Sequence, residues 1–218
     1  MFATISADIV SSTSLTEKDL IRLNTSIKAC LSKLEDKYDG LWGRLVRGDT
    51  IECVTPHVRD ALRIALCIKT LVKSFVPSEG SNDKFSQYAV RMAIAVGDMR
   101  IVNRDLDILD GEAIYLSGRA VSGMTRETFL ISRNFNGYQD LQIMMSLIDF
   151  TINKAKPRQC QTLYYKLLGC SQYEISVSMG ISPSAVSQNL KSVGWDVIEP
   201  AVKYFESFSF NPRHFKVV

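Results

Sequence analysis

The sequence predicts an α+β protein with a ferredoxin-like sheet domain at residues 1–136 and an all-α helix-turn-helix domain at residues 137–218. Three observations carry this prediction. The N-terminal half follows the order β-α-β-β-α-β with a further helix and strand, the chain from Tyr138 onward is helical in pattern, and residues 172–190 have the punctuation of a helix-turn-helix. The break at residues 134–137 is the expected domain boundary.

The elements of the first domain are predicted from the spacing of apolar residues and from turn signals. Asp39-Gly40 ends the long first helix, and Arg47-Gly48-Asp49 forms the tip of a hairpin. We expect the helices to lie on one face of the sheet. The expected elements are strands at 2–10, 41–46, 50–54, 88–96 and 128–132, and helices at 18–38, from Pro56 and from Gly111.

The helix-turn-helix at about residues 157–192 is predicted from its turn. Ile175 and Met179 lie four residues apart on one face of a first helix, and Gly180 stands where the chain must leave that helix with positive φ. Ser182 then caps a second helix, and Pro183 suits the first helical position because no backbone N–H is needed there.

The second helix has an apolar stripe, Val186 and Leu190, and an outward polar face. Short hydrogen-bonding side chains on such a helix can enter the major groove of DNA and read base edges. The pattern resembles the helix-turn-helix of bacterial regulators and sigma factors; the alternative is an ordinary helical hairpin. The predicted DNA-binding residues are Ser184, Ala185, Ser187, Gln188 and Lys191.

Composition is average for a soluble globular protein, and it restricts the partners only weakly. The 218 residues carry a formal charge of +3, so DNA affinity from phosphate contacts should be weak unless two copies act together. The five cysteines form no CxxC pair and indicate buried residues in a reducing compartment. The N-terminus lacks the features of a signal peptide and no apolar run is long enough for a membrane span, so we expect a cytoplasmic protein with no membrane partner.

Two aspartates form a second candidate site. Asp8 lies near the end of the first strand and Asp49 at the tip of the hairpin expected beside it. Converging carboxylates repel each other unless a cation lies between them, and hard oxygen ligands favour Mg²⁺ or Mn²⁺, which could hold nucleotide phosphates. Ser11 and Ser12 follow the strand, where backbone amides could face the phosphates. The alternative is that Asp8 caps a turn and Asp49 fills an ordinary hairpin position.

The motifs SADIVSST, RGDTIECV, RMAIAVGDM and DGEAIYLSGRAV, in this order, resemble the catalytic domain of class III nucleotide cyclases. The resemblance implies metal binding by Asp8 and Asp49 and a catalytic role for Arg119, which stabilises the transition state from the partner subunit. Tyr115 stands where that family has asparagine, and Leu45 stands where it has a purine-reading lysine. Loss of one transition-state donor typically lowers the rate by about 10²–10³, so efficient purine cyclisation is not expected.

The full layout, a short cyclase-like domain followed by a helix-turn-helix, resembles the SatD family of bacterial proteins. In that resemblance Tyr115 is a family aromatic residue and belongs to the nucleotide-binding set with Ser11 and Ser12. The pairing of cyclase-like domains implies a homodimer.

Three functions are therefore open. The first is a DNA-binding transcriptional regulator whose cyclase-like domain binds a nucleotide or metal or mediates dimerisation. The second is an active metal-dependent nucleotidyl cyclase or related phosphoryl-transfer enzyme, addressed to DNA by its helix-turn-helix. In the third, the sheet has lost both ligands and serves dimerisation alone.

Overall fold

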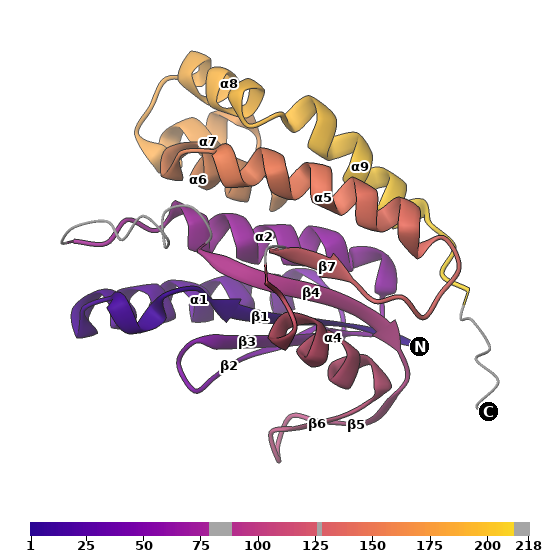
Figure 1. Ribbon diagram of the computed structural model, residues 1–218. Helices are drawn as coiled ribbons and strands as arrows, with labels where there is room; N and C mark the ends of the chain where they lie inside the picture. The colour runs from indigo at the N-terminus through magenta and orange to yellow at the C-terminus, as the bar shows by residue number, and fades with distance from the viewer. Residues whose placement is uncertain (79–88, 126–127, 212–218) are drawn as a thin grey trace.

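The computed structural model describes residues 1–78, 89–125 and 128–211 (Figure 1). At its centre is a five-stranded sheet of order β2-β3-β1-β4-β7, in which β7 alone pairs in parallel. This confirms the predicted α+β class, and the first four strands have the β-α-β-β-α-β arrangement. The strands are β1 (Phe2–Ile9), β2 (Trp42–Val46), β3 (Thr50–Thr55), β4 (Val90–Gly97) and β7 (Phe129–Ile131).

Helices cover both faces of this sheet (Figure 1). The apolar side chains of β1 form a core with α1 and α2. On the opposite face, the Ser117 hydroxyl of α4 lies 3.0 Å from that of Thr4 and 2.7 Å from that of Ser6. The expectation of helices on one face is therefore wrong, because β1 is a central strand whose polar face is buried too. The helices are α1 (Glu17–Lys37), α2 (Ala61–Ser74) and α4 (Glu112–Ser122), with short 3₁₀ turns at Ser12–Ser14 and Val58–Asp60.

A second, two-stranded sheet of β5 (Met99–Asn103) and β6 (Ile108–Gly111) projects from the end of β4 (Figure 1). The sequence did not predict this hairpin. Its apolar side chains are exposed, Leu106 by 66%, so they do not follow the burial pattern by which a strand is recognised. The turn places Asp107, a residue other than glycine, at φ 54°.

The C-terminal part is a helical layer that packs against α2 and β7 (Figure 1). One hydrophobic core extends through both parts of the chain, from Leu62 in α2 to Leu141 in α5 and Leu163 in α6. None of the helices in the described residues has the length and apolar content that crossing a membrane requires. The helices are α5 (Tyr138–Lys154), α6 (Pro157–Leu167), α7 (Gln172–Met179), α8 (Pro183–Ser192) and α9 (Trp195–Ser207).

The outer edge of β7 is covered by one side chain of α5. The Ile131 backbone N–H donates to Gln142 Oε1 at 2.9 Å, and Gln142 Nε2 donates to the Phe129 carbonyl at 3.2 Å. A side-chain amide thus satisfies the backbone groups that a neighbouring strand would otherwise bind.

A buried ion pair joins the sheet to the helical layer. Lys69 of α2 is fully buried, and its Nζ lies 2.8 Å from Asp149 Oδ1 of α5. The ammonium also donates to the carbonyls of Val90 and Thr128, both at 3.3 Å, and the Thr128 hydroxyl donates to Asp149. Burial lowers the pKa of Lys69, and the Asp149 carboxylate opposes that shift. The charged pair is therefore held by a dense set of hydrogen bonds.

We expect Asp149→Asn to lower the free energy of unfolding by about 3–5 kcal/mol, because it leaves the Lys69 ammonium buried without its counterion. The free energy of unfolding should fall less in the double variant Lys69→Met/Asp149→Leu than in Asp149→Asn, because the double variant removes both charges together. Urea unfolding followed by circular dichroism measures both. Asp140→Asn, at an exposed position of the same helix, is the control and should change stability little. A double variant less stable than Asp149→Asn would contradict this account.

Candidate functional site

Asp8 lies on the α4 side of the sheet, between two neighbouring strands. Its register partners are Thr50 of β3 and Arg91 of β4. Arg91 Nη2 donates to Asp8 Oδ2 at 2.8 Å, and both side chains are about one-third exposed. Asp8 therefore has a cationic partner within its own sheet. Arg91 was not predicted as a site residue, because only the strand register reveals that it stands opposite Asp8.

Asp49 adjoins Asp8 through the backbone. The Ile9 N–H donates to the Asp49 carbonyl at 3.0 Å, and the Ser12 hydroxyl donates to Asp49 Oδ2 at 3.4 Å. Ser11 has a left-handed backbone with φ 57°, and its carbonyl accepts a hydrogen bond from the Ser14 hydroxyl at 2.7 Å. The structure thus gathers the two aspartates and the serine turn at the same end of β1.

A cleft of about 410 Å³ opens between this end of the sheet and α4. Its polar lining combines a carboxylate pair, Asp8 and Glu52, with the Arg91 guanidinium. Glu52, like Arg91, was not predicted as a site residue. Glu52 could have been found from the alternation of side chains along β3, which places it on the same face of the sheet as Thr50. The lining residues are Ser6, Ala7, Asp8, Thr50, Glu52, Arg91, Gly118, Val121 and Ser122.

The carboxylates at this site are too few to hold a metal ion by themselves, but they suit a cation that is also bound by the phosphates of a ligand. Among the described residues, no group of three or more His, Cys, Asp or Glu side chains is placed to hold a metal ion. Mg²⁺, however, is commonly bound by one or two carboxylates plus substrate phosphates and water. Asp8 and Asp49 would be the carboxylates, although only Asp8 lines the cleft, and a cation at Asp8 would share that group with Arg91.

Tyr115 and Arg119, expected from the cyclase resemblance, are exposed on α4 and do not line this cleft. The Tyr115 hydroxyl donates to Asp110, which also forms an ion pair with Arg100. The hydrogen bond to Asp110 raises the pKa of Tyr115. The Arg119 side chain forms no hydrogen bond or ion pair with the described part of the chain. Within one chain, then, these two residues are not brought to the aspartates.

The position at which the resembled cyclases have a purine-reading lysine holds an apolar residue. Leu45 packs against the hydrophobic core. Arg44 beside it is engaged: its Nη2 lies 2.6 Å from Glu52 Oε2 and its Nη1 lies 2.9 Å from Asp107 Oδ1. Arg44 therefore ties the β5–β6 hairpin to the main sheet.

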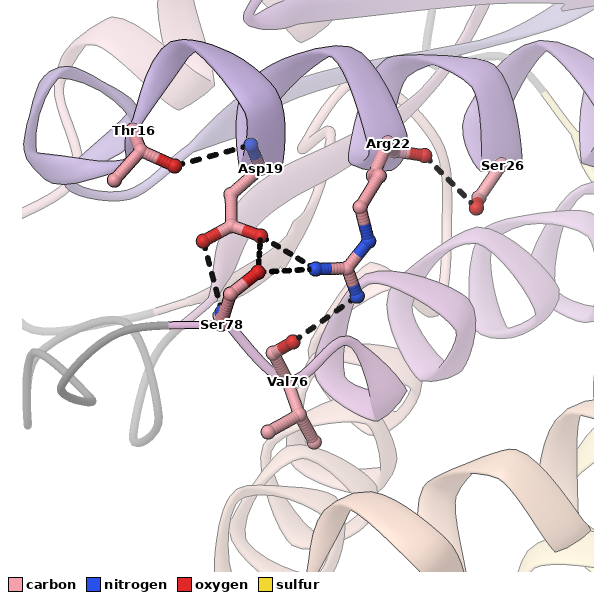
Figure 2. A network of polar contacts seen from close by, with 6 residues as sticks. All are labelled: Thr16, Asp19, Arg22, Ser26, Val76 and Ser78. Carbon is pink, nitrogen blue, oxygen red and sulfur yellow. Dashed lines mark hydrogen bonds and ion pairs between the residues drawn. The ribbon is translucent and has the colours of Figure 1, made fainter.

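The serine turn leads directly into α1, and a polar network fixes the start of that helix (Figure 2). The Thr16 hydroxyl accepts the Asp19 N–H at 3.2 Å and caps α1. The buried Asp19 carboxylate accepts hydrogen bonds from the Ser78 N–H at 2.8 Å and the Ser78 hydroxyl at 2.6 Å. Arg22 Nη1 lies 2.5 Å from the same carboxylate (Figure 2). The segment after α2 is thus bound to the beginning of α1.

The second candidate site is formed by α7 and α8, which are joined by a short turn over α6. Ser171 caps α7 in a capping box with Glu174, and Gly180 ends it with φ 62°. The Ser182 hydroxyl accepts the Ala185 N–H at 3.2 Å and starts α8. Each turn signal in the sequence therefore has the local conformation expected of it.

Packing fixes α7 and α8 against each other and against α6. Ile175 and Val186 are both fully buried. Gln172 Nε2 donates to the Pro183 carbonyl at 2.6 Å, and Asn189 Nδ2 donates to Thr162 Oγ1 of α6 at 3.1 Å. These contacts hold the three helices as one unit with the opposite side of α8 in solvent. Of the predicted DNA-binding residues, Ser184, Ser187, Gln188 and Lys191 are exposed and Ala185 is half-buried.

No known protein-family model matches the sequence, and no curated protein matches it either. Among solved structures, the chain is similar to the dimeric guanylyl cyclase domain of the RhoGC fusion protein from the aquatic fungus Blastocladiella emersonii, with 18% identity over 61% of this chain and 79% of that one, at a TM-score of 0.47.

Two further cyclase structures are similar at the same level. The guanylate cyclase domain of RhGC from Catenaria anguillulae, in complex with GTP, shares 18% identity over 60% of this chain and 76% of that one, at a TM-score of 0.45. A bacterial light-regulated adenylyl cyclase shares 14% identity over 65% and 79%, at a TM-score of 0.44. Such values imply no shared activity. The cyclase resemblance, the SatD resemblance and the helix-turn-helix therefore remain predictions.

The Asp19 network predicts a pH dependence. The Ser78 hydroxyl is the main cause that lowers the pKa of Asp19 below its ordinary value of 3.8. Because the folded pKa lies below the unfolded one, the stabilisation is complete above pH 3.8 and is lost as the pH falls through the folded value. We therefore expect the difference in Tm between wild type and Asp19→Ala to be wide at about pH 7 and to narrow at about pH 2. Asp36→Ala on the same helix is the matched control, and a constant difference for Asp19→Ala would contradict the assignment.

Proposed function

We propose that this chain is a sequence-specific DNA-binding regulator whose sheet part binds a nucleotide. The observation that carries the first half is the unit of α6, α7 and α8. α7, which ends at Gly180, and α8, which is capped by Ser182, pack around Ile175 and Val186, as the two helices of a DNA-binding helix-turn-helix do. The exposed side of α8 presents Ser184, Ser187 and Gln188, which are hydrogen-bonding and short enough to reach base edges.

Charge favours recognition by two copies. Lys191 is the one basic residue in α8, so phosphate contacts from a single chain are few. Affinity then depends on base contacts and on doubling the site in a two-fold dimer, which would place two α8 helices on successive major grooves.

Selection of bound fragments from random DNA at low salt should recover a preferred sequence with two related half-sites. On that DNA, Gln188→Ala/Lys191→Ala should raise the dissociation constant by about 10–100-fold, since it removes one base-reading and one phosphate contact. Gln139→Ala/Lys28→Ala, which removes the same residue types from exposed positions outside the unit, should bind like wild type. Recovery of no preferred sequence would sink the proposal.

The second half of the proposal concerns the cleft beside Asp8. Asp8, Glu52 and Arg91 line this cleft, and Asp49 and the serine turn lie at the same end of β1 without lining it. Carboxylates can hold a divalent cation, and Arg91 and the turn can meet phosphate oxygens. The bound cation would neutralise the phosphate charge. Because Tyr115 and Leu45 replace the asparagine and the lysine of the resembled cyclases, we propose binding without efficient cyclisation.

Titration calorimetry with each nucleoside triphosphate and Mn²⁺ tests this half. We expect Asp8→Asn and Asp49→Asn to weaken binding at least about tenfold, because each removes one charged ligand of the cation. Asp36→Asn is the matched exposed control. Binding that is unchanged in both aspartate variants would rule out the site. Product analysis on the same samples tests the enzyme: a cyclised product formed by wild type and lost in Asp8→Asn would establish the second function.

A further inference from the structure

α5 carries an exposed apolar surface, whose one aromatic ring, that of Phe150, has the Lys154 ammonium of the same helix 3.8 Å from its centroid. Ile143, Leu147 and Phe150, here called the α5 stripe, are exposed by 63%, 64% and 60%. They follow the spacing i, i+4, i+7, so they lie on one side of the helix. Figure 1 shows α5 on the outside of the molecule, and its flanks contact β7 and α9. Single exposed apolar residues are ordinary, but three on one helical face form a continuous surface suited to an interface.

The charges at the two ends of the α5 stripe are opposite. Asp140 is exposed one turn before Ile143, and Lys154 is exposed one turn after Phe150. Asp140, Leu147 and Lys154 are spaced by seven residues, so they form a line along the helix about 21 Å long. The centre of this line is the apolar Leu147.

We propose that the α5 stripe pairs with the α5 stripe of a second copy of this chain. In an antiparallel pair with its two-fold axis at Leu147, Asp140 stands opposite the partner's Lys154, and Ile143 stands near the partner's Phe150. The same two contacts recur on the other side of the axis. The two helix dipoles are antiparallel in this arrangement, so the positive end of each helix lies beside the negative end of the other. One helix therefore supplies both halves of a self-complementary interface.

The pattern fits a second copy better than a membrane surface or an unrelated protein. A helix that binds anionic lipid is basic along its polar face, whereas the α5 stripe begins at an acidic residue. The patch is on the order of a few hundred Å², less than a standard interface needs from each partner, so we expect a reversible dimer in the micromolar range. This inference stands without DNA binding, although it would supply the dimer which that function uses.

Sedimentation equilibrium over a range of concentrations tests the pairing. Wild type should be in monomer–dimer equilibrium, and Leu147→Asp should weaken the dimer at least about 100-fold by placing two carboxylates at the axis. Asp140→Lys and Lys154→Asp should each weaken it about three- to tenfold, because each creates two like-charge contacts per dimer. The double variant Asp140→Lys/Lys154→Asp should restore wild-type association. All substituted side chains are exposed, so thermal unfolding should stay close to that of wild type.

Two controls separate the α5 stripe from other surfaces. Ile21→Asp changes an apolar α1 residue that is 59% exposed, and Leu106→Asp changes the exposed tip of the β5–β6 hairpin. Both variants should dimerise like wild type. A monomeric wild type at about 100 µM, a dimer that survives Leu147→Asp, or a dimer that Leu106→Asp dissociates as readily would each overturn the proposal. A charge-swapped double variant no better than its single variants would do the same.

Discussion

The buried ion pair between Lys69 and Asp149 is the constraint on which the arrangement of the molecule depends. Removing an ammonium and a carboxylate from water is costly unless their geometry and hydrogen bonds compensate. Here the compensation comes from α2, β4, the start of β7 and α5 together. Lys69 and Asp149 can pair only when the helical layer packs on the sheet. A shift of α5 would therefore expose the Lys69 ammonium or leave it buried without its counterion.

In the Asp8 cleft, an ion pair of the sheet lies where we propose that a nucleotide binds. Arg91 balances Asp8 across neighbouring strands, so Asp8 has a partner of opposite charge within the sheet. A ligand that brings its own cation and phosphates would offer each member of this pair a new partner of opposite charge. Under the proposed function, binding would therefore exchange one ion pair for two.

The regular elements and turns could be predicted because their signals are local. Helical spacing gave α1 and α5, and Gly180 and Ser182 gave the turn between α7 and α8. What escaped prediction depends on distant neighbours. Arg91 matters only through strand register, and Lys69 is buried in an ion pair only because α5 supplies Asp149. The β5–β6 hairpin has exposed apolar residues, which remove the alternation by which strands are recognised.

The side chain of Gln142 limits how another chain can add a strand to the edge of β7. An open strand edge is a template on which another chain can add a strand, and uncontrolled addition leads to aggregates. Because the amide already binds the Ile131 N–H and the Phe129 carbonyl, this edge offers an incoming backbone little to bind. Gln142 therefore ends the sheet at β7. Association between chains must then use side-chain surfaces, and such association can be reversible and selective.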